Sequence, residues 1–151
     1  MNFEIVNPNI ANFIQSIRDV GYSFEVAVAD IVDNSIAAKA KNIDILCFQN
    51  PKPYFAILDD GLGLSLEELI EAMRLASKNP NDTRESTDLG RFGLGLKTAS
   101  FSQCKKLTVI SKKNNAISVV CWDLDFIVEQ NEWKLQIMDM NMVEGTSLLN
   151  K

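Results

Sequence analysis

The chain has 151 residues, of which 46% are hydrophobic and 23% are charged, and its mean hydropathy is -0.01. This composition predicts one globular domain over residues 1–151 and excludes an intrinsically disordered chain. No apolar stretch approaches the ~20 residues of a membrane-spanning helix, and the first residues lack a signal-peptide pattern, so we expect a cytoplasmic protein without membrane contact. The net charge of -5 has the wrong sign for a surface that neutralises phosphates, so DNA contact by this domain is not expected.

Histidine is absent and cysteine is scarce, which narrows the chemistry that these residues can perform. A histidine general base, metal ligand or phosphoacceptor is excluded within this sequence. Cys47, Cys104 and Cys121 are too far apart for a metal-binding pair, and their odd number disfavours a disulfide framework. Catalysis by this chain must therefore use carboxylates, lysines or a metal ion.

Capping residues and glycines mark four predicted helices along the chain. They cover Ile10 to Asp19, the residues after Ser23 to about Lys41, the residues after Ser65 to about Ala76, and the residues after the glycine cluster 90–95 to about Gln103. Ser65 and Glu68 have the spacing of a capping box, which fixes the start of the third helix.

Short apolar runs between turn residues predict six strands. They cover Ile43–Phe48, Tyr54–Leu58, Lys106–Ser111, Ala116–Trp122, Trp133–Met138 and Thr146–Leu149. Helices and a strand pair come first and hairpin-linked strands follow, which indicates an α+β fold: a two-layer α/β sandwich whose mixed sheet is covered by helices on one face. The polar run Lys78–Asp88 has little to bury and predicts a loop that is long enough to act as a lid.

Five of the seven glycines lie in two short clusters. The first is Asp59-Asp60-Gly61-Leu62-Gly63, at the end of a predicted strand, and the second is Gly90-Arg91-Phe92-Gly93-Leu94-Gly95, at the start of a predicted helix. Glycines let backbone N–H groups approach an anion, so the second cluster is a candidate phosphate cradle, with ligand-free tight turns as the alternative. Neither cluster has the spacing of a dinucleotide-binding motif or a P-loop. The Asp59 carboxylate can accept a hydrogen bond from an exocyclic amine.

The predicted helix after Ser23 carries a polar pair, Asp30 and Asn34, whose spacing of four residues places them on one face. The Asn34 carboxamide oxygen can ligate Mg²⁺, and the Asp30 carboxylate can orient or deprotonate a water molecule. An ordinary solvated helix face is the alternative for this pair taken by itself. The side of the helix that we expect to pack on the sheet carries Val28, Ile31, Val32 and Ser35.

Taken together, three motifs resemble a known family in their order and spacing. Asp30-Ile31-Val32-Asp33-Asn34 resembles the N box of the GHKL ATPase superfamily, and the two glycine clusters resemble its two glycine boxes. The family includes gyrase B subunits, MutL, heat-shock chaperones, MORC proteins and histidine kinases. The resemblance covers residues 20 to 150, and the segment from Phe92 to Ser100 is most similar to the MORC-like branch.

The resemblance implies a Bergerat fold in which ATP and Mg²⁺ bind between the sheet and the helices, under a mobile lid. By position, Asn34 would ligate Mg²⁺, Asp59 would accept from the adenine amino group and Asp30 would be the general base. The remaining nucleotide contacts implied in this way are Gly61 and Gly63 at the adenine, Gly90, Phe92, Gly93, Leu94 and Gly95 at the phosphates, and Thr146 beneath the adenine. Lys97 stands just past the last glycine, where a lysine can meet a phosphate oxygen, and a solvated lysine is the alternative.

Two positions depart from the family pattern. Family members usually carry Glu where this chain has Asp30, which is shorter by one methylene, about 1.5 Å of reach, and misplacement on that scale can lower a rate on the order of 10²-fold. The usual Asp three residues after the Asn is here Ala37. We therefore expect ATP binding with slow hydrolysis.

The resemblance leaves several functions open. We expect a Mg²⁺-dependent ATPase whose nucleotide cycle drives conformational change or homodimerisation through a transducer domain or a client protein. The first alternative is a nucleotide-binding switch that does not hydrolyse ATP. A histidine kinase catalytic domain is the second, and it is disfavoured because the sequence has no phosphoacceptor histidine. Residues 1–151 are also compatible with the N-terminal fragment of a longer protein.

Overall fold

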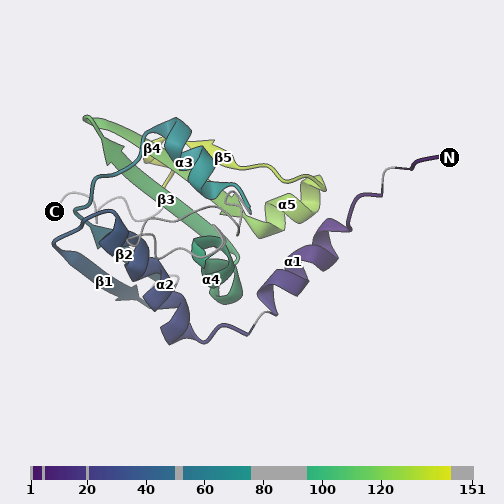
Figure 1. The fold of residues 1–151 in the computed structure, drawn as a ribbon, viewed down its shortest axis with the longest axis horizontal. Coiled ribbons are helices and arrows are strands. Elements are labelled where there is room, and N and C mark those ends of the chain that lie inside the picture. Colours follow the sequence, from purple (N-terminus) through teal and green to yellow (C-terminus); the bar gives the residue numbers. More distant parts are fainter. Residues whose placement is uncertain (1, 5, 20, 50–52, 76–94, 144–151) are drawn as a thin grey trace.

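The computed structural model describes residues 2–4, 6–19, 21–49, 53–75 and 95–143 (Figure 1). Within these ranges the elements are α1 (Ile10–Arg18), α2 (Phe24–Ala37), β1 (Ile43–Phe48), β2 (Tyr54–Asp59), α3 (Leu66–Met73), α4 (Gly95–Gln103), β3 (Lys106–Lys113), β4 (Ala116–Asp123), α5 (Leu124–Gln130), β5 (Gln136–Met138) and a 3-10 turn, η1 (Met140–Met142). This order of elements confirms the predicted α+β class. The predicted lid, Lys78–Asp88, and the predicted strand Thr146–Leu149 lie outside the described residues.

Side-chain caps start the first three helices, and two of these caps, Ser23 and Ser65, were predicted. Asn9 accepts from the backbone N–H of Asn12 at 3.0 Å and begins α1. Ser23 accepts from the N–H of Val26 and begins α2. The capping box of α3 is complete, because Ser65 Oγ accepts from the N–H of Glu68 while the Glu68 carboxylate accepts from the N–H of Ser65.

Helix α2 ends at Ala37, so the predicted end near Lys41 is wrong. The N–H groups of Lys41 and Asn42 are taken by the Asp60 carboxylate, at 2.6 and 3.0 Å, and the Ala38 carbonyl accepts from the N–H of Leu62. Helix α2 ends in a Schellman motif, because the N–H groups of Ala40 and Lys39 donate to the carbonyls of Ser35 and Ile36 while Lys39 adopts a left-handed φ of +63°. The contacts with the segment after β2 hold the turn that follows.

The strands form two antiparallel sets. β1 pairs with β2, and β4 lies between β3 and β5. Among the strands that the structure describes, every pairing is antiparallel. Of the predicted strand Trp133–Met138, only Gln136–Met138 pairs with β4 and forms β5. The helix α5 was not predicted, and the Asp123 carboxylate caps it by accepting from the N–H of Phe126 at 3.2 Å.

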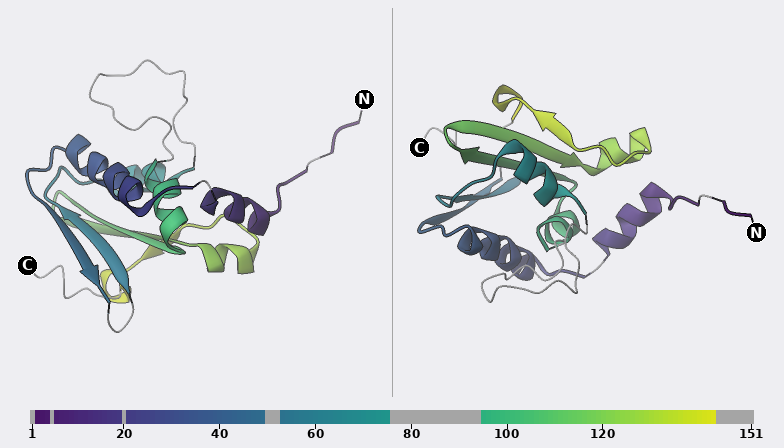
Figure 2. Two further views of the ribbon diagram at one scale, coloured as in Figure 1. Left: turned by 90° about the horizontal axis from the view of Figure 1, so that it is seen from below. Right: turned by 45° about the horizontal axis from the view of Figure 1, so that its top comes forward.

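The core lies between β4 and the helices. It is built from buried side chains of four helices and β4: Ile14, Leu69, Met73, Phe101, Val120, Trp122, Leu124 and Ile127. In Figure 2 (left), α2, α3 and α4 lie along one side of the strands. The Trp122 Nε1–H donates to the Met73 carbonyl at 3.1 Å, so the largest core side chain also has its polar atom satisfied. No helix within the described ranges is long and apolar enough to cross a membrane.

Candidate functional site

Asp59, at the end of β2, holds its carboxylate in a fixed orientation. The hydroxyl of Ser35 donates to Asp59 Oδ2 at 2.9 Å, and the backbone N–H of Gly61 donates to Asp59 Oδ1 at 2.9 Å. Ser35 is buried on α2, whereas Asp59 remains exposed. Because each carboxylate oxygen has two lone pairs, both oxygens keep one acceptor site for a further donor. The arrangement therefore presents an oriented acceptor at the surface, where the end of β2 contacts α2.

Asn34 and Asp30 lie on α2, beside the residue that binds Asp59. The Asn34 Nδ2 donates to the Asp30 backbone carbonyl at 2.9 Å, which leaves Asn34 Oδ1 as the outward atom of an exposed amide. An amide oxygen is the atom that a hard cation such as Mg²⁺ prefers. The Asn34 side chain therefore fits the metal-ligand role implied by the sequence, and Asp30, half-buried one turn earlier, is on the same face.

The glycines after Asp59 allow close contacts between chain segments. A Cβ on Gly61 would lie 2.8 Å from the Ala38 Cβ and 2.9 Å from the Ala38 carbonyl oxygen. Gly63 has φ +65°, and a Cβ there would overlap the Lys112 carbonyl oxygen of β3. Glycine is therefore required at both positions by the close approach of the segment after β2 to Ala38 and to β3. Their contacts with an adenine remain a prediction.

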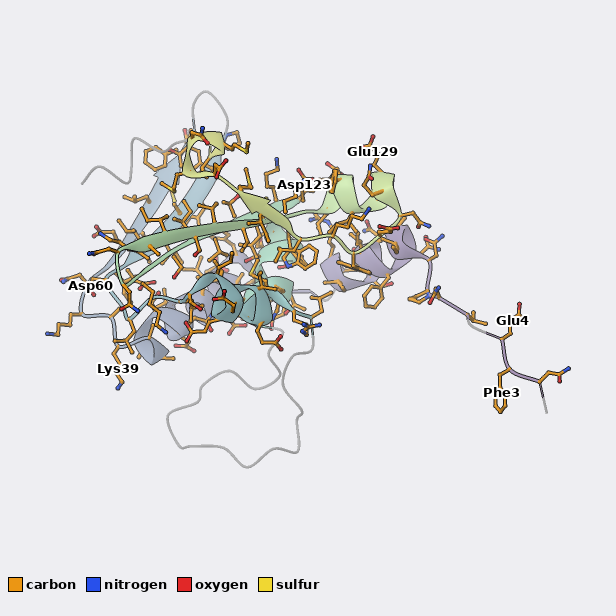
Figure 3. The ribbon with its side chains drawn as sticks, turned by 90° about the horizontal axis from the view of Figure 1, so that it is seen from above. Phe3, Glu4, Lys39, Asp60, Asp123 and Glu129 are labelled. Atoms are coloured by element: carbon orange, nitrogen blue, oxygen red, sulfur yellow. The ribbon has the colours of Figure 1, made fainter. Side chains whose placement is uncertain are left out.

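Asp60, which follows Asp59, has a structural role. Its carboxylate accepts from the N–H groups of Lys41 and Asn42 and from the Asn42 side chain, and these hydrogen bonds lower the pKa of Asp60 to about 2. Figure 3 shows Asp60 and Lys39 at the same end of the molecule. The two adjacent aspartates thus have different roles. The Asp60 carboxylate accepts hydrogen bonds from Lys41 and Asn42, whereas the Asp59 carboxylate keeps acceptor sites open for a further donor.

The second glycine cluster is described only from its last residue. Gly95 is the first residue of α4, whereas Gly90, Phe92, Gly93 and Leu94 lie outside the described residues, as does Thr146. Helix α4 packs against α2, so its N-terminal turn belongs to the same helical layer as Asn34. A helix N-terminus offers unpaired N–H groups to an anion.

Lys97 lies in a different environment from the one expected for a phosphate ligand. Its side chain is 2% exposed, and Nζ donates to the carbonyl oxygens of Ala72 and Arg74, at 2.7 and 2.8 Å. Burial lowers the pKa of Lys97 to about 8, and the nearby Glu71 carboxylate opposes this shift. Contact of Lys97 with a phosphate remains a prediction, and in this structure the ammonium group faces the end of α3.

Ser35 is the site residue that sequence reasoning did not single out. It was expected on the side of α2 that packs on the sheet, and the structure confirms that it is buried there. A hydroxyl in an otherwise apolar helix face requires a hydrogen-bond partner, and that requirement was the available signal. The partner, Asp59, is 24 residues away in sequence and is brought near by the fold.

Comparison with known proteins agrees with this geometry. Residues 22–151 match the model of the family described as histidine kinase-, DNA gyrase B- and HSP90-like ATPases. The chain belongs to this family. It is therefore a GHKL ATPase domain, in a family whose members bind and hydrolyse ATP.

The similar proteins include MORC ATPases and MutL. The GHKL domain is 31% identical to ATPase morc-1 of Caenorhabditis elegans over 111 residues, which cover 72% of this chain and 12% of that protein. It is 31% identical to mouse ATPase MORC2B over 108 residues, 69% of this chain and 10% of that protein. It is also 31% identical to the DNA mismatch repair protein MutL of Pseudomonas fluorescens over 117 residues, 75% of this chain and 18% of that protein. The chain thus spans less than a fifth of the length of each of these relatives.

Proposed function

We propose that this GHKL domain binds ATP together with Mg²⁺ and hydrolyses it slowly, and that the nucleotide cycle drives conformational change or homodimerisation. The observation that supports the proposal best is the Asp59 carboxylate, which Gly61 and Ser35 hold in place, Ser35 being a residue of the same helix, α2, that carries Asn34. An oriented acceptor and a hard metal ligand on neighbouring elements suit a purine nucleotide whose phosphates carry Mg²⁺. A transducer domain or a client protein would use the resulting motion.

At the adenine end, Asp59 accepts a hydrogen bond from the exocyclic amino group. Ser35 keeps the carboxylate from rotating, so less freedom is lost when the base binds. A guanine presents a carbonyl oxygen at the same position, and a carboxylate repels it. The proposal therefore includes a preference for ATP over GTP. Gly61, Gly63 and Thr146 would complete the adenine pocket.

At the phosphate end, Asn34 Oδ1 would hold the metal ion. When bound, Mg²⁺ would neutralise the charge that develops on the phosphates during transfer. The glycine box, Gly90, Gly93 and Gly95 with Phe92 and Leu94, would wrap the phosphates with backbone N–H groups. The first turn of α4 presents further N–H groups in the same layer as α2.

Hydrolysis requires a base for the attacking water, and Asp30 is the proposed general base. The water oxygen bonds to the γ-phosphorus, a water proton passes to a carboxylate oxygen of Asp30, and the bond to the ADP oxygen breaks. Asp30 lies one turn before Asn34 on α2 and is half-buried, which reduces competition from bulk water. Its shorter side chain, relative to the Glu usual in the family, is the reason to expect a slow reaction.

Steady-state phosphate release tests the catalytic part of the proposal. The Asp30→Ala variant should lose turnover by roughly 10²- to 10⁴-fold and still bind ATP, because a general base adds little to ground-state affinity. Asp33→Ala is the matched control, since Asp33 is exposed on the same helix and points about 100° away from Asn34. Turnover that survives Asp30→Ala and disappears with Asp33→Ala would reverse the two roles.

A switch that binds ATP without hydrolysing it is the second candidate, and Asp30 in place of Glu is the observation that favours it. The two functions differ in one measurement. If no variant, Asp30→Glu included, releases phosphate while calorimetry shows ATP binding, the domain is a switch.

A further inference from the structure

At the C-terminal end of α3, three carbonyls are capped by side chains from other elements, while the Glu71 carbonyl accepts from the backbone N–H of Arg74. Lys97 Nζ of α4 donates to the carbonyls of Ala72 and Arg74, and Trp122 Nε1 of β4 donates to the Met73 carbonyl between them. These are carbonyls that a helix end leaves without an intrahelical partner. Helix α3 has no basic residue in its own last turn, so the ammonium group of Lys97 also supplies the positive charge that a helix C-terminus favours.

The position of Lys97 makes this contact relevant to the phosphate site. Lys97 is the third residue of α4, in the turn that begins with Gly95, the last glycine of the box. Its ammonium group therefore joins two points 23 residues apart in sequence, Arg74 at the end of α3 and the first turn of α4. Farther along α4, Phe101 belongs to the same buried core cluster as Met73 of α3.

The burial of Lys97 argues against a side chain that is ready to bind a ligand. The side chain is 2% exposed, and two of its three ammonium protons are used by carbonyls at 2.7 and 2.8 Å. Reaching a phosphate would require breaking both hydrogen bonds and leaving two helix-end carbonyls unpaired, which is costly for buried groups.

We propose that Lys97 is a positioning residue, whose ammonium group ties the end of α3 to the first turn of α4 and so sets where α4 presents its N–H groups to the nucleotide phosphates. The inference rests on the proposed function for its phosphate-binding part. The Lys97 tie, defined as its two hydrogen bonds to the carbonyls of Ala72 and Arg74, is made entirely by groups of this chain. It assigns Lys97 a role different from that of a direct phosphate ligand.

The test compares Lys97→Met, which keeps the length of the side chain and removes the donor, with Lys105→Met. Lys105 is a suitable control because it is 63% exposed and pairs only with Asp125 at the surface. Without ligand, Lys97→Met should lower the melting temperature by roughly 2–12 °C and speed hydrogen exchange in the last turn of α3, because two carbonyls lose their donor. The control should change the melting temperature by about 2 °C or less.

Ligand binding then separates positioning from direct contact. For Lys97→Met we expect ATP affinity about 10-fold weaker and adenosine affinity unchanged, with the salt dependence of ATP binding the same as in the unsubstituted protein. In the protein labelled with ¹⁵N-lysine, the Lys97 ammonium signal should keep its position when ATP and Mg²⁺ are added. A signal that moves to a phosphate-bound position, together with a weaker salt dependence in Lys97→Met, would overturn the positioning role.

The two possible failures are distinguishable. An unchanged melting temperature and unchanged exchange of α3 in Lys97→Met would overturn the Lys97 tie, whatever the nucleotide does. If the unsubstituted protein binds neither ATP nor adenosine while Lys97→Met is destabilised as expected, the proposed function fails and the tie stands.

Discussion

Replacing Asp59 by Asn is the sharpest test of the adenine site. The carboxylate accepts from Ser35 Oγ and from the N–H of Gly61, each at 2.9 Å. An asparagine has one acceptor atom, which must turn toward the Gly61 N–H because that group can only donate. The amide NH₂ then faces Ser35 and the incoming adenine amine, where two donors meet. An unpaired polar group of this kind costs roughly 1–3 kcal/mol, so ATP should bind about 5- to 150-fold more weakly.

Calorimetric titration with ATP and with adenosine measures this loss, which should be the same for both ligands because Asp59 contacts only the base. Ser35→Ala should weaken binding less, about 2- to 12-fold, since it removes one donor worth roughly 0.5–1.5 kcal/mol and leaves the acceptor in place. Asp60→Asn is the matched control, because the Asp60 carboxylate already accepts hydrogen bonds from the N–H groups of Lys41 and Asn42. An Asp59→Asn protein that folds normally and binds ATP as tightly as before would refute the adenine assignment.

Three further predictions concern stability. Gly63→Ala combines a left-handed backbone with overlap at the Lys112 carbonyl and should cost roughly 2–5 kcal/mol in urea denaturation, whereas Gly21→Ala, at φ +76° with open space around it, should cost only about 1–2 kcal/mol. Equal losses would contradict the close approach of Gly63 to β3. The lowered pKa of Asp60 means that its hydrogen bonds stabilise the fold above pH ~4 and are lost as the pH falls toward about 2. Asp60→Asn should therefore flatten the acid side of a curve of folding stability against pH. An unchanged curve would show that the Asp60 carboxylate contributes nothing to stability. Arg18 Nη1 donates to the carbonyls of Phe101 and Cys104, both at 2.7 Å. Arg18→Met should therefore lower the free energy of unfolding by about 1.5–3 kcal/mol in the same denaturation assay. A loss below ~0.5 kcal/mol would mean that α4 does not need this cap.

Elements with local signals were predictable from the sequence. The caps Ser23 and Ser65 fix helix starts through hydrogen bonds within four residues, and the spacing of prolines and apolar runs marked the β1–β2 hairpin. The end of α2 was not predictable in this way, because Lys39 takes the left-handed position that a glycine usually marks, and Asp60 holds the following turn from 18 and 19 positions away. Helix α5 was missed because it is seven residues long and its cap, Asp123, is also the last residue of β4.

In the candidate site, too, the residues with local signals were predictable and those that depend on distant contacts were not. Asp30 and Asn34 were predictable as a pair because helical spacing alone places them on one face, and the structure keeps both on α2. The orientation of Asp59 was not predictable, since Ser35 controls it across the interface between α2 and β2. The environment of Lys97 was missed for a similar reason, because proximity in sequence to the glycine box suggested a phosphate, whereas the nearest acceptors belong to α3.

The contacts of α1 also bear on where the physical domain begins. The family match starts at residue 22, whereas α1 ends at Arg18, so sequence similarity alone would leave this helix out. Yet Ile14 is buried in the core, and Arg18 supplies the donors for the last carbonyls of α4. A shortened protein that starts at the homology boundary would expose a hole in the core and uncap the helix that begins at the glycine box. Anyone who expresses the catalytic unit alone, or grafts it onto another protein, should therefore retain the chain from Asn9, the residue that caps α1.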